Sequence, residues 1–182
     1  LMPVLKDFEK QLNSSLKSEG IPEIRVGNPV GSGTYYQQDL EDNPNKEYGD
    51  IDVQFIIPRI GDKTDAQTRK MYIDAVQEFT RLHGNYDTNN GVNVVFNSTP
   101  IGPIQIDLVA MFDDRVEWTA ALAPERGTKG VLSSSLYSAL AQALNLSISD
   151  DGIRGKVRDG VFVPFTQRKN TTIKTISFDP KN

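Results

Sequence analysis

The chain has 182 residues, 37% of them hydrophobic and 24% charged, which predicts a folded globular protein of one domain or one domain with a small appendage. Its 20 Lys and Arg residues against 24 Asp and Glu give a net charge of −4, which argues against a purely electrostatic grip on nucleic acid but leaves a local basic groove open. The absence of cysteine excludes thiol catalysis, zinc–thiolate sites and disulfides. Since no apolar run approaches the roughly 20 residues that span a bilayer and the N-terminus lacks a signal-peptide core, we expect a cytoplasmic protein with no membrane partner.

The N-terminal region predicts a helix, a strand and a glycine turn. Apolar residues recur at helical spacing and predict an amphipathic helix over residues 3–19 that packs on a sheet and ends at Gly20; they are Val4, Leu5, Phe8, Leu12 and Leu16. Residues 22–26 predict a strand that leads into Gly31-Ser32 and a short helix near residues 34–40. The acidic loop over residues 39–47 lacks the ligand spacing of an EF-hand, so we expect a solvated loop there.

Two aspartates begin the next predicted strand. In residues 50–55 polar and apolar side chains alternate, and strand side chains alternate between faces. Asp50 and Asp52 are therefore expected on one face, with Ile51, Val53 and Phe55 directed into a core.

A second helix and the only histidine follow this strand. Thr64 or Asp65 can cap a helix whose predicted buried face is formed by Tyr72, Ala75, Val76, Phe79 and Leu82. His83 falls in the last turn of this helix, where a residue able to carry positive charge is favoured, and we prefer this explanation to a catalytic base. With one histidine and no cysteine, a hydrolase triad other than one built on His83 is not evident.

A third aspartate lies at the centre of a later strand. Residues 92–96 and 104–112 predict a hairpin that carries Asp107, which we expect beside the first two acids if the strands are neighbours. Three converging carboxylates repel one another unless divalent cations neutralise them, and such oxygen ligands favour Mg²⁺ or Mn²⁺. Two such ions about 3.5 to 4 Å apart can activate an attacking oxygen and stabilise a leaving pyrophosphate. Gly31 and Ser32 would offer backbone N–H groups and a hydroxyl to phosphate oxygens.

The C-terminal part offers weaker functional signals. Trp118 is predicted to be a core residue, with a base-stacking platform as the alternative. Arg126 and Lys129 precede a predicted helix with Leu132, Leu136, Leu140 and Leu144 on one face. These two cations could meet a triphosphate, and a solvated loop with incidental charges is an equal alternative.

Two further strand signals end the chain. Residues 152–164 predict a hairpin with an Asp159-Gly160 turn, and residues 171–178 predict another strand. Arg154, Lys156 and Arg158 would share one face of the hairpin. They could contact a nucleic-acid backbone or a nucleotide phosphate, but a charged edge strand is the commoner explanation.

Taken in order, these motifs resemble the DNA polymerase beta-like nucleotidyltransferase superfamily. Its signature is Gly-Ser or Gly-Gly, then Asp-x-Asp on one strand and a third Asp on a neighbouring strand; Gly31-Ser32, residues 49–53 and residues 106–108 match it. The resemblance covers about residues 21–112, and the segment from Ser32 to Asp50 is longer than in many members. It implies that Asp50, Asp52 and Asp107 bind metal and carry catalysis, and that Gly31 and Ser32 bind phosphate. The alternative is that the three aspartates have no catalytic role. Asp50 would then begin a strand, Asp52 would lie on a solvated face, and Asp107 would be a hydrogen-bonded polar residue.

We therefore expect an α+β fold, with a mixed-sheet nucleotidyltransferase core flanked by helices over residues 1–124 and a small helix-and-hairpin extension over residues 125–182. The expected function is metal-dependent transfer of NMP from an NTP such as ATP to an acceptor hydroxyl, with release of pyrophosphate. The expected acceptor is an RNA or DNA 3′ end. A small-molecule or protein acceptor, which the acidic net charge favours slightly, and a non-catalytic nucleotide-binding module are the alternatives.

Overall fold

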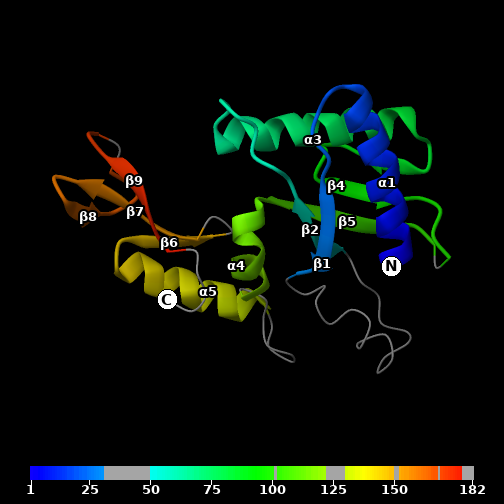
Figure 1. Ribbon diagram of the computed structural model, residues 1–182. Coiled ribbons are helices and arrows are strands. Elements are labelled where there is room, and N and C mark those ends of the chain that lie inside the picture. The colour runs from blue at the N-terminus through cyan, green and yellow to red at the C-terminus, as the bar shows by residue number, and fades with distance from the viewer. Residues whose placement is uncertain (31–49, 101, 122–129, 150–151, 168, 178–182) are drawn as a thin grey trace. The chain divides into compact units, whose positions relative to one another are not determined.

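The computed structural model describes residues 1–30, 50–100, 102–121, 130–149, 152–167 and 169–177 (Figure 1). The chain forms two compact units, Leu1–Asp113 and Asp114–Asn182, each with its own β-sheet. This division lies before the predicted boundary at residue 124, so helix α4 (Val116–Ala121) belongs to the second unit. Within these described ranges, no helix is long and apolar enough to cross a membrane.

The described residues of the first unit form a mixed sheet and two helices. The helices are α1 (Met2–Ser18) and α3 (Asp65–Leu82). The strands are β1 (Arg25–Pro29), β2 (Ile51–Ile56), β3 (Tyr86–Thr88), β4 (Asn93–Phe96) and β5 (Ile104–Met111). In space their order is β1-β2-β5-β4-β3; β2 and β5 run parallel and the other neighbours run antiparallel. The predicted α+β class with a mixed sheet is confirmed.

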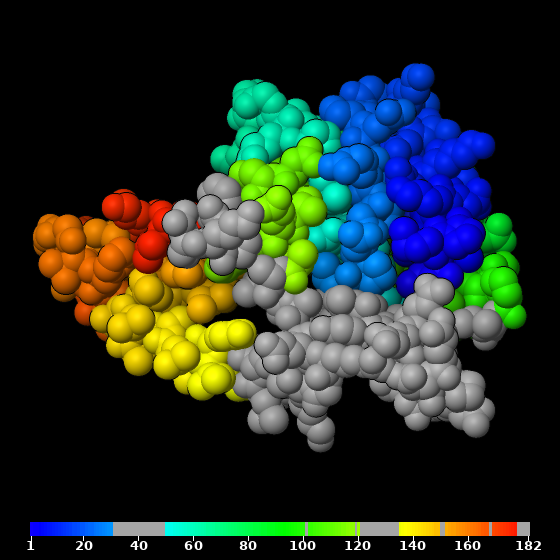
Figure 2. Space-filling view, turned by 60° about the horizontal axis from the view of Figure 1, so that its bottom comes forward, coloured from blue at the N-terminus to red at the C-terminus, as the bar shows by residue number. Residues whose placement is uncertain are grey.

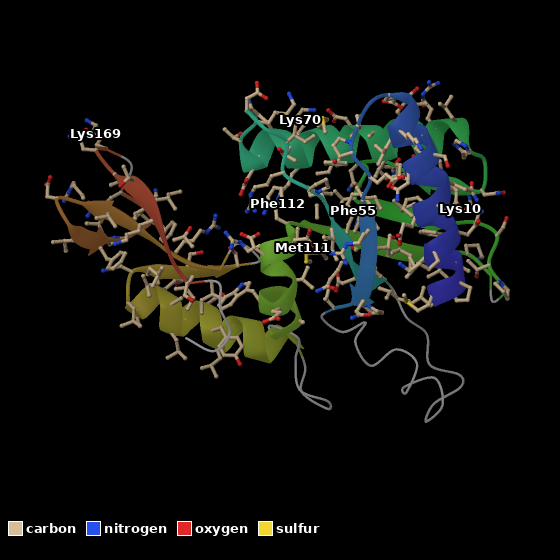
Figure 3. The ribbon with its side chains drawn as sticks, in the orientation of Figure 1. Lys10, Phe55, Lys70, Met111, Phe112 and Lys169 are labelled. Atoms are coloured by element: carbon tan, nitrogen blue, oxygen red, sulfur yellow. The ribbon has the colours of Figure 1, made fainter. Side chains whose placement is uncertain are left out.

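Alternation along the strands and helical spacing in the helices build one core. Ile51, Val53 and Phe55 of β2 share a buried cluster with residues of β5, α1 and α3, which places both helices on one face of the sheet. The Phe8 ring of α1 lies 5.2 to 5.7 Å from the rings of Phe79, Tyr86 and Phe96. Just beyond β5, Phe112 is buried (Figure 3). The Arg59 guanidinium lies 4.3 Å from its ring centroid. The predicted helix over residues 3–19 is confirmed.

Strand β1 begins later in the chain than the predicted strand over residues 22–26 because side chains bond the backbone of those residues. The Asn13 side chain donates to the Ile24 carbonyl at 2.9 Å and accepts from the Ile24 N–H at 2.8 Å. The Tyr72 hydroxyl donates to the Pro22 carbonyl at 2.9 Å. Backbone groups engaged in this way are not available to a strand ladder.

Helix α3 begins as predicted, but its buried face also includes Thr68 and Thr80, which were not predicted, and it excludes Leu82. Thr64 and Gln67 form a reciprocal capping box at its start. The buried face continues through Tyr72, Val76 and Thr80 at four-residue spacing, and the Leu82 side chain lies off this line and is 60% exposed. The prediction of a buried Leu82 is therefore wrong.

Strand β3 was not predicted, although the sequence carries a signal for it. Asn89-Asn90-Gly91 follows β3 and forms a turn in which the Gly91 N–H donates to the Thr88 hydroxyl at 2.9 Å. Gly91 has a φ of +71°, and a Cβ there would lie 2.3 Å from the Ile73 carbonyl oxygen. Only glycine fits this turn without strain.

In the second unit, the residues that the structure describes form two helices and four strands. They are α4, α5 (Gly130–Ala143), β6 (Leu146–Ser149), β7 (Gly152–Arg158), β8 (Val161–Val163) and β9 (Thr172–Ser177). A 3₁₀ turn at Asp113–Arg115 precedes α4. Strand β7 pairs with β6 and then β8 along one edge and with β9 along the other. It is thus an internal strand, and the prediction of a charged edge strand is wrong for Arg154, Lys156 and Arg158.

Two further predictions concern side chains of this unit. Trp118 is buried and its indole N–H donates to the Ser149 carbonyl at 2.8 Å, so its assignment to a core is confirmed. Leu136, Leu140 and Leu144 are between 56% and 66% exposed. The described residues of α5, in yellow, lie at the surface in Figure 2. The Asp159-Gly160 turn is confirmed, with φ values of 51° and 81°.

Candidate functional site

Two of the predicted aspartates lie directly opposite each other. In the parallel pair of β2 and β5, Asp52 is in register with Asp107. Their strand neighbours, such as Ile51 and Ile106, are directed into the core below the helices, so both aspartates project from the other face of the sheet. Neighbouring strands lie about 4.8 Å apart, which makes these carboxylates close neighbours on one partly exposed surface.

Asp50 immediately precedes β2 and is exposed. Because it lies two residues before Asp52, its side chain would project from the same face if the strand continued. Asp50, however, lies outside the paired residues of β2 and β5. In the described ranges, no group of three or more His, Cys, Asp or Glu side chains is arranged to hold a metal ion. The structure therefore brings together Asp52 and Asp107, and the addition of Asp50 to them stays a prediction.

The predicted phosphate-binding residues Gly31, Ser32, Arg126 and Lys129 lie outside the described residues. What the structure describes is the chain that leads to the first two of them. The Val30 N–H donates to the Asp52 carbonyl oxygen at 2.9 Å, and Val30 is buried. The residue that precedes Gly31 is thus bonded to the backbone of a candidate catalytic residue.

Gln54 of β2 and Gly27 of β1 pack closely where β1 approaches Val30. The Gln54 side chain is only 1% exposed and its Oε1 accepts from the Asn28 N–H at 3.3 Å. A Cβ at position 27 would lie 2.6 Å from the same oxygen and 2.9 Å from the Gln54 Cβ, so a larger residue there would displace the Gln54 side chain. The pairing of β1 with β2 shifts register between Val26 and Pro29, and this bond lies within the irregular stretch.

Two neutral amide side chains lie beside Asp107. The Gln105 Nε2 donates to the Asp107 Oδ1 at 3.0 Å, within β5 itself. Asn93 of β4 is opposite Asp107, and the bond from the Leu108 N–H to the Val92 carbonyl identifies a non-hydrogen-bonded pair, in which side chains lie closest. Neither Gln105 nor Asn93 is among the site residues predicted from the sequence. Strand alternation could have placed them on the face of Asp107, because Asn93 precedes the buried Val94 and Gln105 precedes the buried Ile106.

The other candidate residues lie in different surroundings. His83 caps the C-terminus of α3, its Nδ1 lies 2.8 Å from the Phe79 carbonyl oxygen, and its ring stacks on Phe79 with centroids 4.1 Å apart. In the second unit, Lys156 donates to the Phe165 carbonyl at 2.6 Å and to the Gln167 carbonyl at 3.0 Å, and Arg154 donates to the Ser149 hydroxyl at 2.9 Å. Two of the three basic residues of β7, Arg154 and Lys156, therefore form hydrogen bonds within the second unit.

Comparison with known structures gives a distant likeness to a polymerase. No protein-family model matches the sequence, and no curated protein matches it significantly. Two crystal structures of Leishmania infantum polymerase beta are similar at 12% identity over 84% of this chain: a ternary P/T complex, with a TM-score of 0.47, and a ternary gap complex, with a TM-score of 0.46. The matches cover 56% and 49% of those chains, so this chain spans about half of their length.

Proposed function

We propose that the chain is a metal-dependent nucleotidyltransferase that moves NMP from an NTP to an acceptor hydroxyl and releases pyrophosphate. The observation that supports this proposal best is the register of Asp52 with Asp107 on parallel strands, on the sheet face opposite the helices. The bond between Val30 and Asp52 supports it further, because Gly31 and Ser32 follow Val30 in the chain.

The chemistry of the donor set fits a hard divalent cation. Asp50, Asp52 and Asp107 offer carboxylate oxygens, the ligands that Mg²⁺ and Mn²⁺ favour. These three residues would hold the metal. When bound, a divalent cation neutralises charge that develops on the transferred phosphate and the leaving group.

The chain's own residues account for the remaining roles. The acceptor oxygen forms a bond to the α-phosphorus while its proton passes to the Asp107 carboxylate. The bond from the α-phosphorus to the bridging oxygen breaks, and the electron pair leaves with pyrophosphate. Gly31 and Ser32 brace the β- and γ-phosphates, and Arg126 and Lys129 offset the charge of the triphosphate.

The proposed acceptor is the 3′ end of RNA or DNA. A second candidate is transfer to a small molecule or a protein side chain, and the net charge of −4 favours it, because a large polyanion gains little from an acidic protein. The two candidates share the same site and differ only in the acceptor.

One labelling experiment tests the activity and separates the acceptors. The full chain is incubated with each α-labelled NTP and Mg²⁺ or Mn²⁺, together with RNA, DNA or a protein extract in separate reactions. We expect label on a nucleic-acid 3′ end and release of pyrophosphate. Label only on small molecules or protein would contradict the nucleic-acid acceptor and support the second candidate. No transfer from any NTP would contradict the proposed activity and support a non-catalytic nucleotide-binding module.

The matched variants are Asp52→Asn and Asp87→Asn. Asp52→Asn should lower transfer by about 100- to 1000-fold, the usual cost of removing one group that stabilises developing charge. Asp87 is an exposed residue of β3 in the same sheet, so its variant should retain activity. Circular dichroism should show that both variants fold, and full activity of Asp52→Asn would contradict the proposal.

A further inference from the structure

The hydrogen bond between Gln105 and Asp107 suggests a role beyond the three aspartates. Both residues belong to β5 and lie two positions apart, so they project from the same face of the sheet. The Gln105 Nε2 lies 3.0 Å from the Asp107 Oδ1 in a partly buried position. We propose that Gln105 is a positioning residue, which orients the Asp107 carboxylate toward a divalent cation; this rests on the proposed function.

The neutrality of this donor matters for the metal. A Lys or Arg partner would hold the carboxylate and also offset its charge, whereas an amide orients it and leaves the full negative charge for a cation. Within the described part of the chain, no cationic side chain forms an ion pair with Asp107. Gln105 engages one carboxylate oxygen, so the second oxygen retains its full capacity as a ligand.

The other neighbour of Asp107 across the sheet is also a neutral amide. Asn93 is opposite Asp107 on β4, and its Oδ1 accepts from the Asn90 side chain, which orients the Asn93 amide. Asp107 therefore has Asp52 on one side and Asn93 on the other, with Gln105 along its own strand. The Gln105 bond restrains the carboxylate, and neither amide supplies positive charge, as expected for side chains that surround and orient a metal ligand.

The first test compares Gln105→Leu with a matched control. Leucine has a similar size and no donor. Gln77→Leu is the control, because Gln77 is an exposed residue of α3 in the same unit and its amide donates to a backbone carbonyl, that of Asn89, at 3.5 Å. The measurements are the affinity of the nucleotide-free full chain for Mn²⁺, by calorimetry or electron paramagnetic resonance, and kcat and KM for NMP transfer.

We expect Gln105→Leu to weaken Mn²⁺ binding and lower kcat by about 10- to 100-fold, the range found for side chains that orient a metal ligand, while KM for the NTP changes little. Gln77→Leu should leave all three quantities unchanged. If Gln105→Leu does not fold, Gln105→Met, which keeps an unbranched chain of similar length, takes its place. Unchanged Mn²⁺ affinity in the folded variant would overturn the proposal.

The second test asks whether Gln105 acts through Asp107. In an Asp107→Asn background, Gln105→Leu should weaken Mn²⁺ binding no further, because the carboxylate that it orients is gone. An equal loss in both backgrounds would overturn the positioning role and leave the proposed function intact. Wild-type protein that binds no Mn²⁺, or Asp107→Asn with unchanged affinity, would instead overturn the proposed function and this inference with it.

Discussion

Tyr72 and Asp107 are polar residues of the same unit, and their surroundings give them different roles. Tyr72 is fully buried in the core, and its hydroxyl donates to the Pro22 carbonyl, which ties α3 to the segment between α1 and β1. Asp107 lies on the opposite face of the sheet, is partly exposed, and accepts from a neutral amide. The first side chain stabilises the fold, and the second remains accessible to a ligand.

Tyr72→Phe should change how stability depends on pH. Burial raises the pKa of Tyr72 to about 12. Because this value is above the ordinary pKa of about 10, the neutral phenol stabilises the fold fully below pH 10 and the contribution is lost as pH rises toward 12. The variant should lose about 1 kcal/mol at neutral pH with the bond to Pro22, and should show a smaller further loss in alkali.

Urea unfolding from neutral pH to alkali measures both effects. Burial and the charge of Asp7 also raise the pKa of Tyr86, so part of the alkaline loss should remain in the variant. An identical alkaline loss in wild type and Tyr72→Phe would show that Tyr72 does not titrate in the way inferred from its burial.

At the scale of elements, the sequence predicted the helices and strands that depend mainly on interactions between residues close together in the chain. Helix α3 has a capping box and a buried stripe, and both can be read from residues a few positions apart. The beginning of β1 could not be read in this way, because side chains of α1 and α3 bond the backbone of Ile24 and Pro22. Strand β7 was predicted, but its internal position depends on pairing with β9, which lies later in the chain.

Thr64→Ala should destabilise the protein through the start of α3. It removes the hydroxyl that accepts from the Gln67 N–H at 3.2 Å and leaves that donor without its cap. The expected loss is about 1 kcal/mol in the free energy of unfolding, measured by urea denaturation. Thr64→Ser keeps the hydroxyl and should stay within a few tenths of a kcal/mol of wild type. Equal stability of all three proteins would show that the cap contributes nothing.

At the scale of the whole molecule, the first unit has a hydrophobic core of its own. The members of the main buried cluster all lie between Leu5 and Phe112, within the unit Leu1–Asp113. That unit also contains Asp50, Asp52, Asp107 and Gln105. The core and the candidate metal ligands therefore belong to one folding unit.

A fragment of residues 1–113 should consequently fold alone. We expect cooperative thermal unfolding and dispersed amide resonances, because no member of the main core cluster is removed. It should also bind Mn²⁺ with an affinity within about tenfold of the full chain, since the proposed ligands are retained. An unfolded fragment would show that the second unit is needed for the stability of the first.

The sequence alone determined the α+β class, α1, α3, the strands that carry Asp52 and Asp107, and the residue types suited to a divalent cation, because helical spacing, strand alternation and caps depend on near neighbours. Only the tertiary structure decided that Asp52 is in register with Asp107, that Val30 bonds the backbone of Asp52, and that Asn93 lies opposite Asp107. These relations depend on pairing between segments far apart in the chain. A shift of one residue in that pairing would move each side chain to the other face, so spacing within a strand cannot specify its partner.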